Sequence, residues 1–289
     1  MNIYSNIRKD ADLQKLGPSY SFAKTLRKYV DKPVCIISNA RGGTSLSKFS
    51  NGGEYYTPMM ERISRANDFG TVKGVIWHHG EANSSNYASY LGTLNSLVGD
   101  IRGAVDTNFY FLAGQLGPWD GKYEGFNENL TQIQSYIDNA DYVHNDRIEH
   151  LGDETHFNTP SQLLMGSRYA QKILEELYDI PIGVYEFYLP DELIVTSGTD
   201  TIRTGERIIY TTQWSDVLSF TLHCNEGLGF DTLAINNSLI SVSDGAQSYE
   251  FSAGSRDTVF SITASFEIVS NEAETTKPAL GFYPNPSTR

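Results

Sequence analysis

The stretch KGVIWHHGEANSSNYASYLGTLNSLVGDIRGAVDTNFYFLAGQL, residues 73–116, places a helical pattern between two apolar runs. The runs GVIWHHG (74–80) and FYFLAGQL (109–116) are predicted strands, and residues 84–105 between them carry apolar side chains at helical spacing. A strand, a helix and a second strand in this order predict two parallel strands joined by a crossover helix.

The same alternation extends over residues 1–180. Helices are predicted over 21–30 and 128–140, a buried strand over 33–40, and a short last strand over 141–145. A final helix begins with Thr159 as its N-cap, Pro160 in its first turn and Gln162 completing a capping box. These elements predict an α/β fold in which helices flank a parallel sheet. Ligands of such folds bind at the carboxyl ends of the strands, so the loops that follow residues 38, 77 and 115 are of most interest.

The composition changes after residue 184, where short runs rich in Thr, Ser, Ile, Val and Tyr are broken by Gly, Asn and Asp. This pattern predicts a small all-β sandwich over 184–270, which could bind glycans or act as a spacer. A polar linker and the ending LGFYPNPSTR occupy 271–289. The sequence thus predicts an α/β domain over 1–180, a β-sandwich and a tail.

Charge and cysteine content exclude several classes of protein. The 289 residues include 22 basic and 35 acidic side chains, a formal net charge of -13, which argues against a nucleic-acid or anionic-membrane surface. Cys35 and Cys224 lie too far apart to form a metal spacing or a disulfide framework. No apolar run approaches the ~18 residues of a membrane helix, and the N-terminus has no apolar signal core.

Three loops carry residues suited to chemistry. In NARGGTSLSKF (39–49), the pair Gly42–Gly43 allows a tight turn and brings bare N–H groups close to a ligand, although an ordinary turn has the same pattern. In LGDETHFNTP (151–160), Asp153 and His156 are close enough for the carboxylate to orient the imidazole. Such a pair fits the base and its orienting acid in serine-type ester hydrolysis.

The third loop, HHGE, admits more than one interpretation. Side chains alternate along a strand, so His79 and Glu81 share a face while His78 points the other way, which disfavours a metal site built from both histidines. A zinc site would need a third ligand from His144, His150 or His156. A buried structural turn and a zinc hydrolase that uses His79, Glu81 and His156 both remain open.

Five segments together resemble one family, the sialate O-acetylesterases. They are, in chain order, GPSYSFAKTL (17–26), NARGGTSLSKF, KGVIWHHGEAN (73–83), FYFLAGQL and GDETHF (152–157). This family is a branch of the SGNH hydrolases that includes the acetyl xylan esterases of carbohydrate esterase family six. The resemblance spans most of residues 1–178 and implies an acetylated carbohydrate substrate, with no metal or organic cofactor.

The resemblance also implies roles for individual residues. His156 would be the general base, and Asp153 or Glu81 would orient it. Gly42 or Gly43 would donate a backbone N–H to the oxyanion. His79 stands where the family usually has a glutamine whose amide helps to hold the oxyanion, and an imidazole N–H can also donate.

Two departures from the family pattern set further expectations. The family's serine nucleophile lies in a G-Q-S-N motif upstream of the first quoted segment, whereas Ser5 in YSNI follows no apolar strand and Ser45 is not used by the family. We therefore expect the first strand and its serine to be missing and this chain to be nearly inactive. The alternative function is a carbohydrate-binding or adhesive protein with a degenerate esterase domain.

The ending LGFYPNPSTR resembles the start of the C-terminal sorting domain that directs proteins through the type IX secretion system of Bacteroidetes. This resemblance implies a secreted or cell-surface protein of a Gram-negative bacterium and, as a partner, the secretion machinery.

Overall fold

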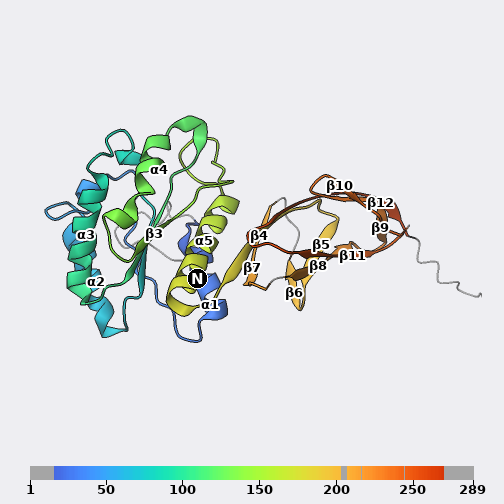
Figure 1. Ribbon diagram of the computed structural model, residues 1–289, viewed down its shortest axis with the longest axis horizontal. Coiled ribbons are helices and arrows are strands. Elements are labelled where there is room, and N and C mark those ends of the chain that lie inside the picture. The colour runs from blue at the N-terminus through green and yellow to red at the C-terminus, as the bar shows by residue number, and fades with distance from the viewer. Residues whose placement is uncertain (1–15, 203–206, 216, 244, 270–289) are drawn as a thin grey trace, which may run out of the picture. The chain divides into compact units, whose positions relative to one another are not determined.

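A computed structural model describes residues 16–202, 207–215, 217–243 and 245–269 (Figure 1). The chain divides into two compact units. The first contains the residues up to Tyr188 together with Arg207–Leu218 and Ala253–Phe260, and the second contains the rest. Ser5 and the tail 271–289 lie outside the described residues, and the predicted domain boundaries stay a prediction.

The first unit is built on a parallel sheet, as the sequence predicts. Its strands are β1 (Gly74–Trp77), β2 (Tyr110–Gly114) and β3 (Ala140–Val143), in the order β1-β2-β3. Ile76 pairs with Leu112, which pairs with Asp141 on the other side. Every residue of β2 is buried, as a central strand covered on both faces requires.

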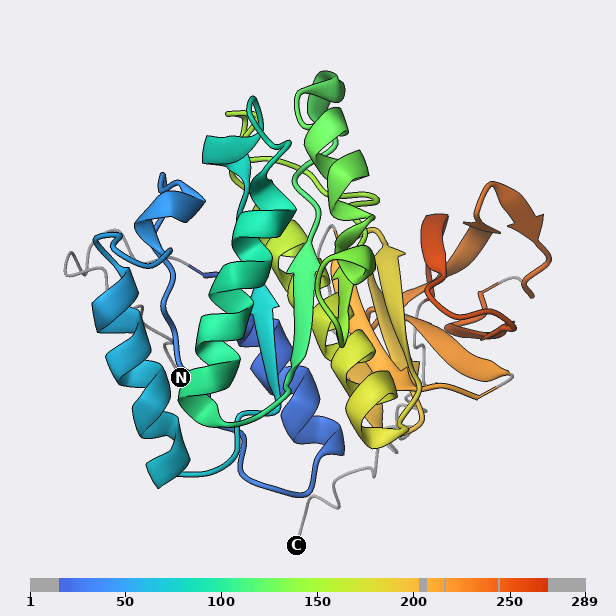
Figure 2. The same cartoon turned by 60° about the vertical axis from the view of Figure 1, so that its left-hand side comes forward.

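Five α-helices flank this sheet: α1 (Ser19–Tyr29), α2 (Tyr56–Ser64), α3 (Tyr90–Val105), α4 (Glu124–Leu130) and α5 (Thr159–Tyr178). Helices α2, α3 and α4 lie on one face, and α1 and α5 lie on the other (Figures 1 and 2). Short 3-10 helices lie in the connections: η2 (Leu46–Lys48), η3 (Arg65–Asp68), η4 (Glu81–Asn83), η5 (Trp119–Gly121) and η6 (Ile133–Ser135). Two of them, η2 and η4, lie in the loops that the sequence marks as functional.

The first unit also contains an antiparallel pair of strands, β4 (Ile182–Tyr188) and β7 (Ile208–Gln213). Val184 pairs with Thr211 in this pair. Ile182 and Val184 belong to the same core cluster as the residues of α3 and β2. The packed core of this unit therefore continues past the end of α5.

Three local predictions are wrong. Residues 33–40 form no strand with any described residue, and Ile37 is 43% exposed there, because an apolar run becomes a strand only where another strand lies beside it. In place of one helix over 128–140, the chain forms α4 and then η6. The N-cap of α5 is Asn158 in place of Thr159, and its side chain accepts a hydrogen bond from the backbone N–H of Ser161 at 3.0 Å.

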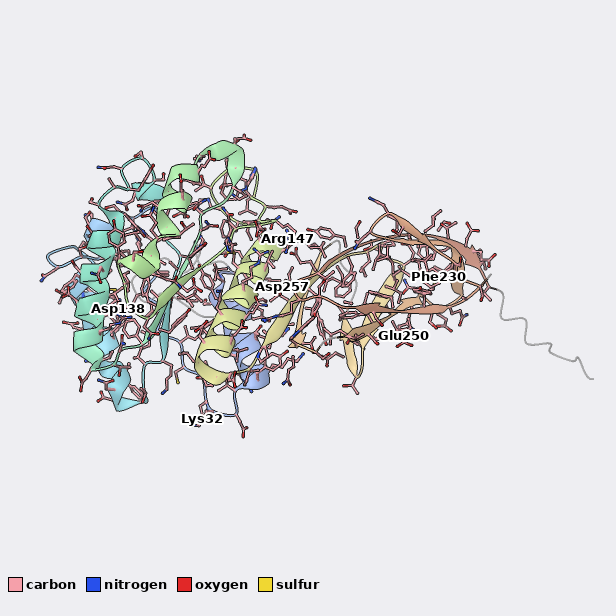
Figure 3. All side chains as sticks on the ribbon, in the orientation of Figure 1. Lys32, Asp138, Arg147, Phe230, Glu250 and Asp257 are labelled. Atoms are coloured by element: carbon pink, nitrogen blue, oxygen red, sulfur yellow. The ribbon has the colours of Figure 1, made fainter. Side chains whose placement is uncertain are left out.

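The second unit is rich in strands. They are β5 (Leu193–Ser197), β6 (Asp200–Ile202), β8 (Leu218–Cys224), β9 (Leu228–Ile235), β10 (Ser238–Ile240), β11 (Ser248–Ala253) and β12 (Val259–Ile268). Strands β11, β8, β5 and β6 form one sheet, while β9 pairs antiparallel with both β10 and β12. Phe230 of β9 is fully buried (Figure 3). A β-rich region is thus confirmed, and the packing of its sheets as a sandwich stays a prediction.

Candidate active site

Asp153 and His156 form a closely bonded pair in the loop between β3 and α5. Nδ1 of His156 lies 2.6 Å from Oδ2 of Asp153. The other carboxylate oxygen accepts the backbone N–H groups of His156 at 2.8 Å and Thr155 at 3.1 Å. The carboxylate therefore binds the ring and the backbone of the same residue, which fixes the ring relative to the turn.

These bonds keep the carboxylate ionised. The backbone N–H of His156, followed by its ring, lowers the pKa of Asp153 well below the usual value. An ionised carboxylate accepts Nδ1–H, which leaves Nε2 of the ring as the atom able to accept a proton. The His156 side chain is 71% exposed, so this nitrogen is open to a substrate. The pair has the geometry of a general base and its orienting acid.

The loop that carries the pair, residues 149–158, is closed at its base like a hairpin. The backbone N–H of Asn158 donates to the carbonyl of Glu149 at 3.0 Å, and the Asn158 amide donates to the Glu149 carboxylate at 2.8 Å. His150 and Phe157 form a β-bridge, and the N–H of Leu151 donates to the carbonyl of His156 at 2.9 Å. We call residues 149–151 and 156–158 the stem of this loop.

Trp119 and Lys122, which follow β2 in the chain, contact the loop 149–158. The Trp119 ring packs edge-on against His150 at 5.2 Å and against Phe157 at 5.7 Å between ring centres. Nζ of Lys122 donates to the carbonyl of Glu154 at 2.9 Å and to the Thr155 hydroxyl at 3.2 Å. The position of His156 thus depends on contacts from another part of the chain.

The Gly42–Gly43 turn offers hydrogen-bond donors. Both glycines are exposed, and Gly43 has φ 66°, a left-handed conformation that favours glycine. The backbone N–H groups of Gly42 and Gly43 make no hydrogen bond to any residue in the described part of the chain. Two free amide donors in an exposed turn are suited to an oxyanion.

His79 holds this turn in place. Its Nε2 lies 2.7 Å from the carbonyl oxygen of Thr44, and its Nδ1 lies 2.9 Å from the hydroxyl of Tyr90. The Tyr90 hydroxyl also accepts the indole N–H of Trp77 at 3.0 Å. A carbonyl can only accept, so in the neutral ring Nε2 carries the proton. The single proton of the Tyr90 hydroxyl is then shared between two acceptors, Nδ1 of His79 and the His79 carbonyl, which lies 3.1 Å from the hydroxyl. Burial lowers the pKa of His79, which favours this neutral form.

The single N–H of neutral His79 is therefore engaged by Thr44. An oxyanion could receive this N–H only if the ring left the Thr44 carbonyl. In the structure the ring joins the turn 78–83 to the glycine turn, and Asn83 makes a second connection by accepting the N–H of Leu46 at 2.9 Å. Whether His79 also binds the oxyanion stays a prediction.

Glu81 and His78 make no hydrogen bond to Asp153 or His156 among the described residues. Glu81 is the first residue of η4. In the described part of the chain, the side-chain partner of the His156 ring is Asp153, not Glu81. Nδ1 of His78 lies 3.1 Å from the Tyr169 hydroxyl, and its ring packs edge-on against Phe157 at 4.9 Å. Burial lowers the pKa of His78. Of the two acids that the sequence proposes, the structure brings Asp153 to His156.

Comparison with known proteins identifies a family for this chain. Residues 2–175 match the sequence profile of a family described as carbohydrate esterase, sialic acid-specific acetylesterase. The chain belongs to this family. Among curated proteins, no significant match was found.

A solved structure from Arabidopsis thaliana has a similar fold. The two structures superpose with a TM-score of 0.53, at 20% sequence identity, over 58% of this chain and 71% of the plant protein. At this level of identity the likeness concerns the fold alone. It agrees with the parallel sheet and flanking helices of an esterase of this family.

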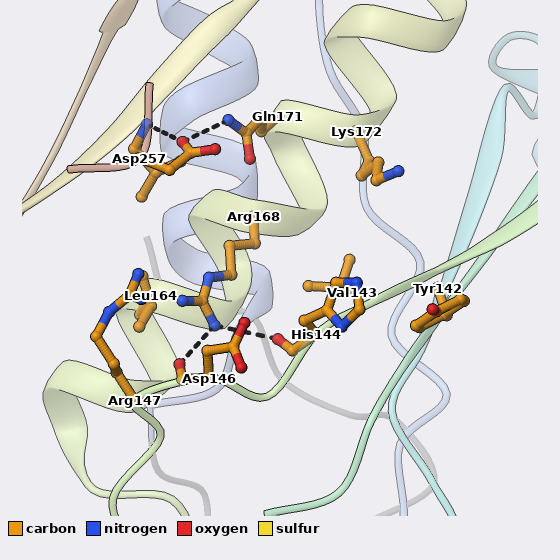
Figure 4. Close-up of a pocket in the computed structure, with 11 residues that line it drawn as sticks. Tyr142, Val143, His144, Asp146, Arg147, Leu164, Arg168, Gln171, Lys172 and Asp257 are labelled. Atoms are coloured by element: carbon orange, nitrogen blue, oxygen red, sulfur yellow. Dashed lines mark hydrogen bonds between the residues drawn. The ribbon is translucent and has the colours of Figure 1, made fainter. Parts of the chain in front are cut away.

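The described part of the chain offers a further pocket and no metal-binding cluster. No group of three His, Cys, Asp or Glu side chains within the described ranges could hold a metal ion. A pocket of about 270 Å³ lies beside β3 and α5, and Figure 4 shows Arg147, Arg168 and Lys172 among its lining residues. It contains none of the residues that the sequence assigns to the esterase site.

Sequence reasoning missed an amide network that joins the residues after β2 to Asn127 of α4 and to Asn145, which follows β3. The Asn127 side chain accepts the N–H of Leu116 at 2.8 Å and donates to its carbonyl at 2.9 Å. The Asn145 amide donates to the same carbonyl, and its backbone N–H donates to Gln115 at 3.3 Å. Polar side chains at three distant positions gave no sequence pattern that would connect them.

Across the described segments, no helix is both long and apolar enough to cross a bilayer.

Proposed function

We propose that this chain carries the acid–base machinery of a serine-type carbohydrate O-acetylesterase. The observation that carries the proposal is the 2.6 Å contact between His156 and Asp153, which leaves Nε2 of His156 exposed. Membership of a carbohydrate esterase family supplies the reaction class and an acetylated sugar as substrate. The geometry favours Asp153 over Glu81 as the acid that orients His156.

The reaction would run in two steps. A serine Oγ attacks the acetyl carbonyl carbon while Nε2 of His156 takes the hydroxyl proton. The tetrahedral intermediate collapses, and His156 returns the proton to the departing sugar oxygen. Water, activated by the same nitrogen, then attacks the acetyl-serine and releases acetate. Asp153 stays ionised and stabilises the imidazolium in both steps.

The glycine turn would hold the oxyanion. The free N–H groups of Gly42 and Gly43 are the donors that support this assignment, and His79 would act by holding Thr44 and thereby the turn. Preorganised donors of this kind are worth about 10²–10³ in turnover each.

The nucleophilic serine would come from outside the described residues. No serine hydroxyl in the described ranges is hydrogen-bonded to His156, and the hydroxyl of Ser45 lies 2.8 Å from that of Ser47. A fluorophosphonate probe followed by mass spectrometry tests this directly. We expect no stoichiometric adduct on any serine of the described ranges. A stoichiometric adduct on Ser45, or on another serine of the described ranges, would contradict the assignment.

Acetate release tests the reaction itself. The protein is incubated with O-acetylated sialic acid and with acetyl xylan, and His156→Ala is the matched control. We expect release that depends on His156 from at least one of the two substrates. Failure to release acetate from either substrate would leave the family assignment intact and reject the activity.

A second candidate function is carbohydrate binding by a non-catalytic esterase fold. It is favoured by His79, whose N–H is engaged by Thr44 in place of being free for an oxyanion. In this case acetylated xylan or sialic acid would bind in calorimetry without acetate release by any natural form of the protein.

Export through type IX secretion is also a proposal, and it is supported by the ending LGFYPNPSTR. Fusing residues 271–289 to a reporter in a Bacteroidetes host tests it by the reporter's appearance in the medium.

A further inference from the structure

Glu186 of β4 is a buried carboxylate surrounded by arginines. Its side chain is 1% exposed. Arg147 donates Nε–H to one of its oxygens at 2.6 Å, and Arg207 donates to the other from Nε at 3.0 Å and from Nη2 at 2.6 Å. Arg168 lies 4.0 Å away, with a side chain that is 12% exposed. A buried carboxylate requires such pairing, and these arginines in turn require the carboxylate.

The arginines connect Glu186 to the backbone of residues 144–147, which precede the loop 149–158. Nη2 of Arg207 also donates to the carbonyl of Arg147 at 2.6 Å. Nη1 of Arg168 donates to the carbonyls of His144 at 3.1 Å and Asp146 at 2.8 Å (Figure 4). Three carbonyls in four successive residues are therefore held by guanidinium groups gathered around one carboxylate.

The backbone at this point needs support. Arg147 has φ 58°, a left-handed conformation that is unusual for a residue other than glycine. Such a conformation persists where surrounding contacts enforce it, and the contacts here are the bonds to Glu186 and Arg207.

The same cluster reaches the stem of the loop. Nη1 of Arg207 lies 3.2 Å from Oε1 of Glu149, whose other oxygen accepts the Asn158 amide. Glu149 and Asn158 close the base of the loop that holds Asp153 and His156. A continuous set of contacts thus runs from Glu186 through Arg207 and Glu149 to the base of the stem.

Glu186 and Arg207 lie beyond residues 2–175, the range that matches the esterase family. The support for the loop therefore comes from β4 and from the residue just before β7.

We propose that Glu186 is a positioning residue for His156, acting through Arg147 and Arg207 on residues 144–149 and the stem. The role of His156 as a general base rests on the proposed function. The effect of Glu186 on the conformation of the loop does not depend on that role. Loss of the Glu186 charge releases the three guanidinium groups and loosens the loop while the sheet and helices stay folded.

The test is hydrogen exchange of the full 289-residue chain, wild type against Glu186→Gln, which keeps the side-chain size and removes the charge. We expect amides of 147–158 to exchange about tenfold faster or more, with amides of α3 and β2 unchanged. In NMR of 15N-histidine-labelled protein, the Nδ1–H signal of His156 is expected to broaden or disappear.

The matched control is Val98→Ala, which removes buried volume from α3 without touching the cluster. It is expected to lower overall stability and leave exchange of 147–158 as in the wild type. If Glu186→Gln accelerates the loop and α3 equally, or changes neither, the positioning role is wrong.

Arg207→Lys decides the matter if Glu186→Gln does not fold. Lysine keeps the charge beside Glu186 but cannot bind Glu186 and the Arg147 carbonyl with the same fork. Faster exchange confined to 147–158 supports the proposal, and unchanged exchange rejects it. Neither experiment requires turnover, so a failure of the esterase assay does not affect the result.

Discussion

Two segments of this protein place histidines in opposite surroundings. In the loop 149–158, His156 is exposed and bonded to an ionised carboxylate. In the turn 78–83, His78 and His79 are held by tyrosine hydroxyls and a backbone carbonyl, and burial lowers the pKa of both rings. His156 is thus exposed and paired with a carboxylate, whereas His78 and His79 are held in surroundings that favour the neutral ring. Solvent exposure and the partner of Nδ1 account for the difference.

The largest expected effect is on turnover and lies in the exposed segment. His156→Gln should lower kcat about 10²–10⁴-fold, because the proposed general base is lost. The free energy of unfolding should change by less than about 0.5 kcal/mol, since the side chain is exposed. Acetate release and urea unfolding measure the two quantities. If His156→Gln lowered the free energy of unfolding strongly and kcat only slightly, His156 would have a structural role in place of the catalytic one.

A comparable effect should separate the two candidate acids. Asp153→Asn should lower kcat about 10³–10⁴-fold, because an amide in place of the carboxylate can favour the wrong ring tautomer. Glu81→Gln serves as the matched control and is expected to change kcat less than about threefold, since Glu81 makes no hydrogen bond to His156 among the described residues. The reverse ranking would assign the orienting role to Glu81.

The next effect concerns the buried segment. A Cβ added at Gly114 would lie 1.8 Å from the Tyr169 hydroxyl and 2.7 Å from Nδ1 of His78. Gly114→Ala should therefore lower the free energy of unfolding by about 3 kcal/mol. Gly99→Ala in α3, where nothing lies within 4 Å of the new Cβ, should raise it by about 0.5–1 kcal/mol. Equal effects of the two alanines in thermal unfolding would show that the His78 environment is not tightly packed.

The smallest effect is a pH dependence of stability. The pKa values of His78 and His79 are lowered from 6.5 in the folded state, so below pH 6.5 the unfolded chain binds protons that the folded chain does not. The free energy of unfolding should fall as the pH falls below 6.5, on account of these two rings. His79→Gln should flatten this dependence and change stability at pH 8 by less than about 1 kcal/mol, because an amide can still donate to Thr44. An unchanged slope would place the titration elsewhere.

Local patterns predicted some elements well. The helical spacing in 84–105 corresponds to α3, and the apolar runs beside it correspond to β1 and β2. The run 33–40 is as apolar as these but forms no strand with the described residues. Helix bonds lie within a segment, so a segment can specify them, whereas a strand depends on a neighbour that its own residues do not encode.

The same distinction applies to the candidate site. By itself the sequence marked Asp153 and His156 as a candidate pair, since three residues of spacing can bring these side chains together, and it predicted a tight turn at Gly42–Gly43. Only the tertiary structure decided that Asp153 rather than Glu81 contacts His156, that Thr44 engages the His79 N–H, and that Glu186 gathers its arginines. The His79–Thr44 contact joins residues 35 positions apart, and the contacts of Glu186 with Arg207 and Arg147 join residues 21 and 39 positions apart, so folding alone brings them together.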